Sequence, residues 1–128
     1  MGLLSTARQD IKETLELNGI KAVGYNEDNI LAPVAIIVPD EMYILPPANK
    51  QKMNQLNVGI SVLVVASRGL KDKHADELDD LIEKVVLLLD EFMDIDYVTG
   101  PGKVSIKSQD HLGAVIHVQY QIKIGGSN

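Results

Sequence analysis

The sequence contains no cysteine and no tryptophan, and its 128 residues include one phenylalanine and four tyrosines. The absence of cysteine excludes a disulfide framework, thiolate metal ligands and a thiol nucleophile. Because aromatic side chains are scarce, the interior is left to isoleucine, leucine and valine, which supply 13, 15 and 13 residues. Together with 23% charged residues, this composition excludes a disordered or collagen-like chain and indicates a single domain with an aliphatic core.

Long apolar runs are also missing. The longest, such as residues 62–66 and 85–89, fall far short of the ~20 residues that cross a membrane as a helix. The first ten residues, MGLLSTARQD, have neither the basic start nor the apolar stretch of a secretory signal. We therefore expect a soluble protein of the cytoplasm with no membrane partner.

A surplus of basic residues is absent as well. The net charge is −6, and residues 71–94 account for all of it with nine carboxylates and three lysines. The rest of the chain carries nine residues of each sign. Because affinity for nucleic acid comes mainly from lysine and arginine on phosphates, this balance argues against a DNA-binding protein.

Hydrophobic periodicity predicts an α+β fold. Apolar residues recur at helical spacing in two segments, and they alternate or run continuously in several others. The order, helix, three or four strands, helix, two strands, is typical of a mainly antiparallel sheet with two helices on one face. We expect residues 1–124 to form this domain and residues 125–128 to be a flexible tail. The expected helices are 3–18 and 71–94, and the expected strands are 20–24, 34–38 with 42–45, 57–67, 103–107 and 112–124, with an exposed loop at 46–55.

Two of the expected strands, 57–67 and the last one, are unusually long. At ~3.3 Å per residue they span about 36 and 43 Å, whereas a compact domain of this length is roughly 36 Å across. The first of them also carries Leu63 and Val65 on the face opposite its core residues. Either these strands bend, or they reach past their own core to a second copy of the chain. We expect an oligomer.

No catalytic or metal-binding motif is found. The three histidines are His74 at the start of the second helix, His111 in a turn and His117 on the polar face of the last strand. Such positions are typical of solvated histidines rather than ligands or bases. The acidic residues of the second helix read more simply as a solvated face than as oxygen ligands of a divalent ion. We expect no cofactor, no metal ion and no enzymatic activity.

Several residues stand out as candidates for an interface. Asp90, Glu91 and Asp94 are expected in the last turn of the second helix, where the helix dipole disfavours negative charge, and Leu87 lies opposite its apolar stripe. A partner surface would explain them, although one exposed leucine needs no explanation. The full set of candidates adds the tip of the 46–55 loop and two strand faces: Lys50, Lys52, Met53, Leu63, Val65, Leu87, Asp90, Glu91, Asp94, His117 and Gln119.

The order of four blocks, residues 32–40, 57–69, 76–90 and 111–124, resembles the tail terminator proteins of long-tailed bacteriophages. The resemblance covers nearly the whole chain but rests on a pattern of elements and includes no catalytic motif. It implies a hexameric ring on the last disc of the tail tube. Such a ring stops tube polymerisation and joins the tail to a head-completion protein, in a virion that is assembled in the host cytoplasm.

The resemblance implies three partners: further copies of the chain, the tail tube protein and the head-completion or neck protein. DNA would only pass through the ring, and a chain without net positive charge would not retard it. A head-completion or stopper protein and a tail-tube subunit are alternatives within phage assembly. An α+β domain that binds or converts a small molecule is an alternative of another class.

Overall fold

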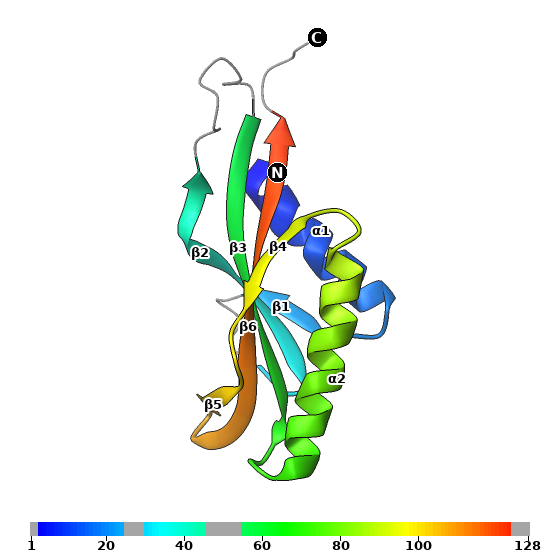
Figure 1. Ribbon diagram of the computed structural model, residues 1–128, viewed down its shortest axis with the longest axis vertical. Helices are drawn as coiled ribbons and strands as arrows, with labels where there is room; N and C mark the ends of the chain where they lie inside the picture. The colour runs from blue at the N-terminus through cyan, green and yellow to red at the C-terminus, as the bar shows by residue number, and fades with distance from the viewer. Residues whose placement is uncertain (1–2, 25–29, 46–54, 124–128) are drawn as a thin grey trace.

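The computed structural model describes residues 3–24, 30–45 and 55–123 (Figure 1). The expected α+β class and the expected order of elements are confirmed, and one further strand, β4, lies between the second helix and the last two expected strands. The elements are α1 (Leu3–Leu17), β1 (Ala22–Gly24), β2 (Val34–Leu45), β3 (Gln55–Arg68), α2 (Asp72–Leu89), β4 (Asp94–Val98), β5 (Gly102–Ile106) and β6 (Gln109–Lys123).

One six-stranded sheet joins all the strands, in the order β1-β2-β3-β6-β4, with β5 also paired to β6. Among the strands in the described ranges, only the short β1 runs parallel to its neighbour, β2, and the other pairs are antiparallel. The longest ladder joins β3 to β6, from Gln55 opposite Lys123 to Arg68 opposite His111. Residues 34–38 and 42–45, expected as separate pieces, belong to the single strand β2, whose register shifts between Pro39 and Ile44.

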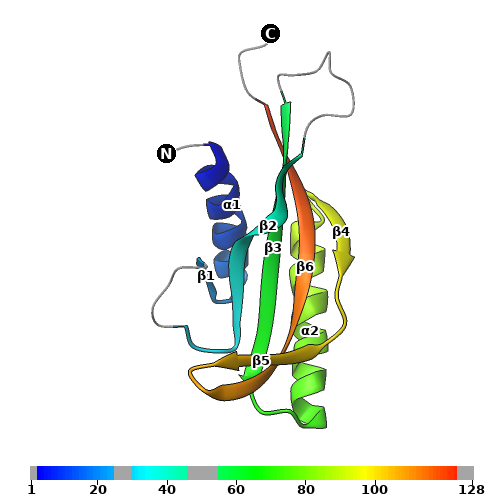
Figure 2. The same ribbon diagram turned by 90° about the vertical axis from the view of Figure 1, so that its left-hand side faces the viewer.

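Both helices cover the same face of the sheet, as expected, and a hydrophobic core lies between the two layers (Figure 2). The alternation expected in β3 is confirmed, because every residue expected on its core face is fully buried. The α2 stripe enters the same core through Leu78, Val85 and Leu89. The core-facing β3 residues are Val58, Ile60, Val62, Val64 and Ala66.

A second, smaller apolar cluster lies on the opposite face of the sheet. Val23, Val34, Ile36 and Val65 form its buried part, and Val104 and Ile106 are among the half-buried residues that pack against it. Figure 2 shows why: β5 and the start of β6 curl across this face of the sheet, away from α2. The apolar second face of β3 is therefore covered, at this end, by another segment of the same chain.

Strands β4 and β5 pair with successive parts of one β6 edge. The first pairs with residues 116–119, and the second with residues 109–113. Between them, Thr99 stands in for a strand residue, because its amide donates to the Val115 carbonyl and its hydroxyl accepts from the Val115 amide, both at 2.9 Å. The β6 edge is thereby occupied along most of its length.

The long strands both bend and overrun the helices. At ~3.3 Å per residue, the 14 residues of β3 and the 15 residues of β6 correspond to about 46 and 50 Å of strand. The first part of β6 curves toward β5, while the far ends of β3 and β6 rise beyond both helices (Figure 2). Among the described residues, no helix is long and apolar enough to cross a membrane.

Candidate functional site

The open part of the outer sheet face, where β5 does not reach, carries a group of polar and aromatic side chains. Tyr97 of β4 stacks on His117 of β6, with ring centroids 4.2 Å apart and planes at 20°. On the next strand, Ser61 lies directly opposite His117, and its Oγ is 3.3 Å from the histidine Nδ1. Below we call these residues, with Asp96 and Gln119, the outer polar patch.

Gln119 extends this patch toward the sheet edge. Its side-chain amide donates a 3.1 Å hydrogen bond to the Asp96 carboxylate. Asp96 occupies the point where the β4–β6 register shifts, between the pairs of Ile95 and Tyr97. The interface candidates His117 and Gln119 therefore do lie together on one face, but their neighbours Tyr97 and Asp96 were not expected beside them.

Ser61 and His117 are residue types that serve elsewhere as nucleophile and base. Sequence reasoning missed this pair because its members lie 56 residues apart and meet only through the β3–β6 register. Ser61 is in the middle of a strand and only 7% exposed, and the ring of Tyr97 lies against the imidazole. This arrangement favours a structural or contact role for the pair over a catalytic one.

Two interface candidates on β3 do not lie on an open surface. Val65 is fully buried in the second apolar cluster, and Leu63 is half-buried against it. The inference that this second face needs another copy of the chain to cover it is therefore wrong at Val65. The physical reason is the β5–β6 hairpin, whose Val104 and Ile106 pack against the cluster within the same molecule.

The acidic candidates after α2 also need correction. The helix ends at Leu89 rather than extending to Asp94, with Asp90 as its C-terminal cap, and the amides of Phe92 and Met93 bond back to the Leu89 carbonyl. Asp94 lies outside the helix as the first residue of β4. Asp90 and Glu91 remain exposed near the helix C-terminus, while Asp94 escapes the unfavourable dipole that was expected for it.

Leu87 is 64% exposed on the outer side of α2, as expected from its position opposite the apolar stripe. The loop candidates Lys50, Lys52 and Met53, and the expected tail at residues 125–128, lie outside the described residues. The exposed acidic residues of α2 do not converge: among the described residues, no group of three or more histidine, aspartate or glutamate side chains is placed to hold a metal ion.

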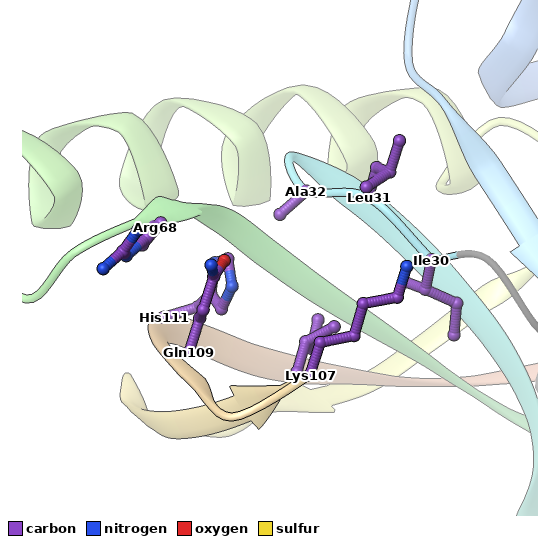
Figure 3. A pocket seen from close by; sticks show the side chains of 8 residues that line it. Ile30, Leu31, Ala32, Arg68, Lys107, Gln109 and His111 are labelled. Atoms are coloured by element: carbon purple, nitrogen blue, oxygen red, sulfur yellow. The ribbon is translucent and has the colours of Figure 1, made fainter.

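A small cavity of about 130 Å³ lies on the outer face, beside the second apolar cluster (Figure 3). Residues 30–32, the end of β3 and the β5–β6 turn line it. In Figure 3, Arg68, Gln109 and His111 lie on one side, while Lys107 extends along the other toward Ile30. None of the four polar lining residues was among the sequence-derived candidates, because only the hairpin brings them together.

His111 is the buried member of this set. It was expected in a turn, but it lies within β6, is 5% exposed, and its Nδ1 is 2.9 Å from the Ala66 carbonyl oxygen. Because a carbonyl oxygen can only accept, this Nδ1 carries a hydrogen. The turn itself lies at Lys107 and Ser108, four and three residues before His111.

The two groups differ in the chemistry they offer. The outer polar patch presents an exposed aromatic ring together with carboxylate and amide groups on the surface of the sheet, which suits contact with another protein. The cavity presents two cationic side chains in a concave setting, which suits a small ligand. Neither a protein-family model nor a curated protein sequence matches this chain.

Proposed function

We propose that this chain is a structural subunit of a long-tailed bacteriophage that closes into a hexameric ring at the end of the tail tube. There it stops tube polymerisation and provides the surface to which the filled head is joined. It would act in the virion after assembly in the host cytoplasm, with the tail tube protein, the head-completion protein and further copies of itself as partners. No catalytic step is required of it.

One observation carries the proposal: the central sheet is longer than the helical layer that covers it. The ladder between β2 and β3 continues to Leu45 opposite Asn57, and the ladder between β3 and β6 continues to Gln55 opposite Lys123. Figure 2 shows these ends projecting beyond α1 and α2. A layer of strands without its covering helices is a surface that neighbouring subunits can complete.

The positions of the four resembling blocks also support the proposal. They fall on β2 with the residues just before it, on β3, on α2 and on β6, which build the main core together with α1. The second apolar cluster no longer contributes, because the chain covers it itself. Support for the ring therefore comes from the length of the strands, which extend beyond the helices, rather than from apolar residues on both of their faces.

The direct test is the state of the purified protein. Sedimentation equilibrium and negative-stain imaging should show closed rings of uniform diameter. A tail-tube subunit would instead grow into long cylinders, so the same images separate these two functions. A monodisperse species of 14.0 kDa at high concentration would contradict ring formation.

A second test addresses the place of the ring in the particle. Pre-formed rings added to polymerising tail tube protein should bind one end of each tube and stop its growth. Binding to isolated heads without any effect on tube length would favour the head-completion alternative. If the rings bind neither heads nor tubes, a joining role is excluded.

A further inference from the structure

The cavity beside the β5–β6 turn is lined by groups of one electrostatic character. Arg68 and Lys107 supply two positive charges, and Gln109 and His111 supply further polar atoms. The other described lining residues are aliphatic. None of the described lining residues carries a carboxylate. In a chain whose net charge is −6, a concave site with this lining is a local reversal of sign.

The backbone holds the two cations on opposite walls. Arg68 ends β3, where it pairs with His111 across the register shift of the β3–β6 ladder. Lys107 occupies the two-residue turn between Ile106 and Gln109. Because both flanking strands are paired in the sheet, the backbone positions of Arg68 and Lys107 are fixed by short connections rather than by a long loop, while their side chains are exposed.

Lys107 occupies an unfavourable conformation for its residue type. Its φ is 51° and that of Ser108 is 65°, the pattern of a type I′ turn, in which asparagine and glycine are preferred. A lysine at this position costs free energy relative to glycine, which has no Cβ to crowd the backbone, and relative to asparagine, whose short polar side chain can bond to the nearby backbone. Strain of this kind concentrates at binding sites, where the side chain is needed for another purpose.

His111 completes the wall. Its ring is fixed by the hydrogen bond between Nδ1 and the Ala66 carbonyl oxygen, so Nε2 is the ring nitrogen that can interact with a ligand. The cavity volume of about 130 Å³ is far above the roughly 10–15 Å³ that one water molecule needs. It therefore has room for a small polyatomic group.

From these observations we propose that the cavity lined by Arg68, Lys107, Gln109 and His111 binds a small oxyanion, a carboxylate or a phosphate. Arginine matches either group through paired N–H donors, and lysine adds a point charge. The oxyanion has two available sources: a free anion, or an acidic side chain of another copy of the chain. The inference does not depend on phage function, since a free anion can be measured on the isolated protein.

The first experiment titrates inorganic phosphate, and separately acetate, into the protein in low-chloride buffer, with binding followed by calorimetry and by the ring resonances of His111. Arg68→Gln and Lys107→Asn should each weaken binding at least about tenfold, as expected for loss of a charged hydrogen-bond partner. Lys103→Gln is the matched control, because Lys103 is exposed on the same hairpin and does not line the cavity.

Lys107→Asn also separates a binding role from a structural one. Asparagine is preferred in this turn, so the variant should unfold at an equal or higher temperature while it binds the anion more weakly. A purely structural lysine would show no loss of anion binding in this variant.

The second experiment tests the other source. If free anions do not bind saturably but Arg68→Glu with Lys107→Glu dissociates the oligomer, while Lys103→Glu leaves it intact, the oxyanion is a carboxylate of a second copy. Absence of saturable anion binding together with an unchanged particle mass in the double variant would overturn the proposal. If the anion site is overturned in this way but the protein still forms a ring, the proposed function stands. If the wild-type protein is a monomer, the proposed function is contradicted but the anion site is not.

Discussion

The hydroxyl of Tyr120 donates a 2.8 Å hydrogen bond to the carboxylate of Asp10, which ties the last strand to the first helix across 110 positions of sequence. Phe92, in the turn after α2, meets the same tyrosine ring edge-on, with centroids 6.2 Å apart. One side chain of β6 thus contacts α1 and the end of α2. We expect Tyr120→Phe, which keeps the ring contact and removes the bond, to lower the free energy of unfolding by about 1 kcal/mol in urea denaturation.

The same contact predicts a dependence on alkaline pH. The hydrogen bond to Asp10, followed by burial and the negative charge of that carboxylate, raises the pKa of Tyr120 above its ordinary value of 10.0. Because the folded protein holds this proton more tightly than the unfolded chain, the contribution is present in full below pH 10 and is lost as the pH rises through the folded-state pKa.

A difference titration measures this shift. The tyrosinate absorbance of Tyr120→Phe, subtracted from that of the wild-type protein, isolates this one residue. Asp10→Asn should move the transition back toward pH 10. A midpoint at or below 10 in the wild-type protein would contradict the assigned bond.

Glu77 fastens α2 to the end of β3. Both the amide and the hydroxyl of Ser67 donate to its carboxylate, the hydroxyl at 2.9 Å. A glutamine here keeps only one acceptor oxygen and turns an N–H₂ group toward a donor, so Glu77→Gln should destabilise the protein by roughly 1–2 kcal/mol in urea denaturation. Glu83→Gln is the control on the same helix, because Glu83 is exposed, and its effect should stay within about 0.5 kcal/mol.

Gly69 precedes α2 in a conformation that only glycine adopts easily, with φ at +135°. An added Cβ would also collide with the ring of His74, whose Nδ1 accepts a hydrogen bond from the Lys71 amide at the helix start. Gly69→Ala should therefore cost about 1–3 kcal/mol in thermal or urea unfolding. Gly100→Ala, where a Cβ meets nothing within 4 Å, should be nearly neutral, and equal losses at both glycines would disprove this reasoning.

Truncation of Val65 should destabilise the protein far more than truncation of Leu87, because Val65 is buried within the chain and Leu87 is exposed. Val65→Ala removes two methyl groups from the second apolar cluster and should cost about 1–3 kcal/mol of stability. Leu87→Ala should change stability by less than about 0.5 kcal/mol. Urea denaturation of the two variants under conditions that keep the protein monomeric provides the comparison.

Leu87→Asp tests α2 as an interface in the proposed ring. The variant should fold normally yet lower the particle mass measured by light scattering, because a carboxylate would be buried against a neighbour. Leu17→Asp is the matched control at an exposed leucine of α1 that we do not place at an interface. An unchanged mass for Leu87→Asp would remove this residue from the interface.

Periodicity was sufficient for the main core. Alternation along β3 and the apolar stripe of α2 translate directly into burial, because a strand repeats every two residues and a helix every 3.6. Val62 and Leu78 are examples of residues whose burial follows from spacing alone. Leu87, an interface candidate on α2, could likewise be placed on the exposed side, whereas Leu63 and Val65 on β3 could not.

Spacing was insufficient where the chain changes direction. In β4, Asp94, Asp96 and Tyr97 are exposed, so the strand lacks the apolar alternation that would indicate it, and the sequence pattern places Asp94 in the preceding helix instead. His111 was placed in a turn because polar residues precede it, whereas the actual turn uses Lys107 and Ser108. A lysine and a serine in a type I′ turn carry no sequence signal.

The candidate cavity and the second apolar cluster share a further reason for being missed. Alternation shows that the outer face of β3 is apolar, but not whether another molecule or another segment covers it. Here Val104 and Ile106 do so, and their hairpin also brings Arg68 and His111 beside Lys107. Such convergence depends on the path of the chain after β4, which local patterns leave undetermined.

That path passes from one side of the sheet to the other. Ile95 and Val98 pack against the core beneath the helices, whereas Val104 and Ile106 pack against the cluster on the opposite face. The crossing falls at Thr99 and the Gly100-Pro101-Gly102 stretch. One short connection therefore links the strand that packs on the helix side of the sheet to the strand that packs on the opposite side. Proteolysis of a single peptide bond in this connection would therefore loosen the packing on both faces of the sheet.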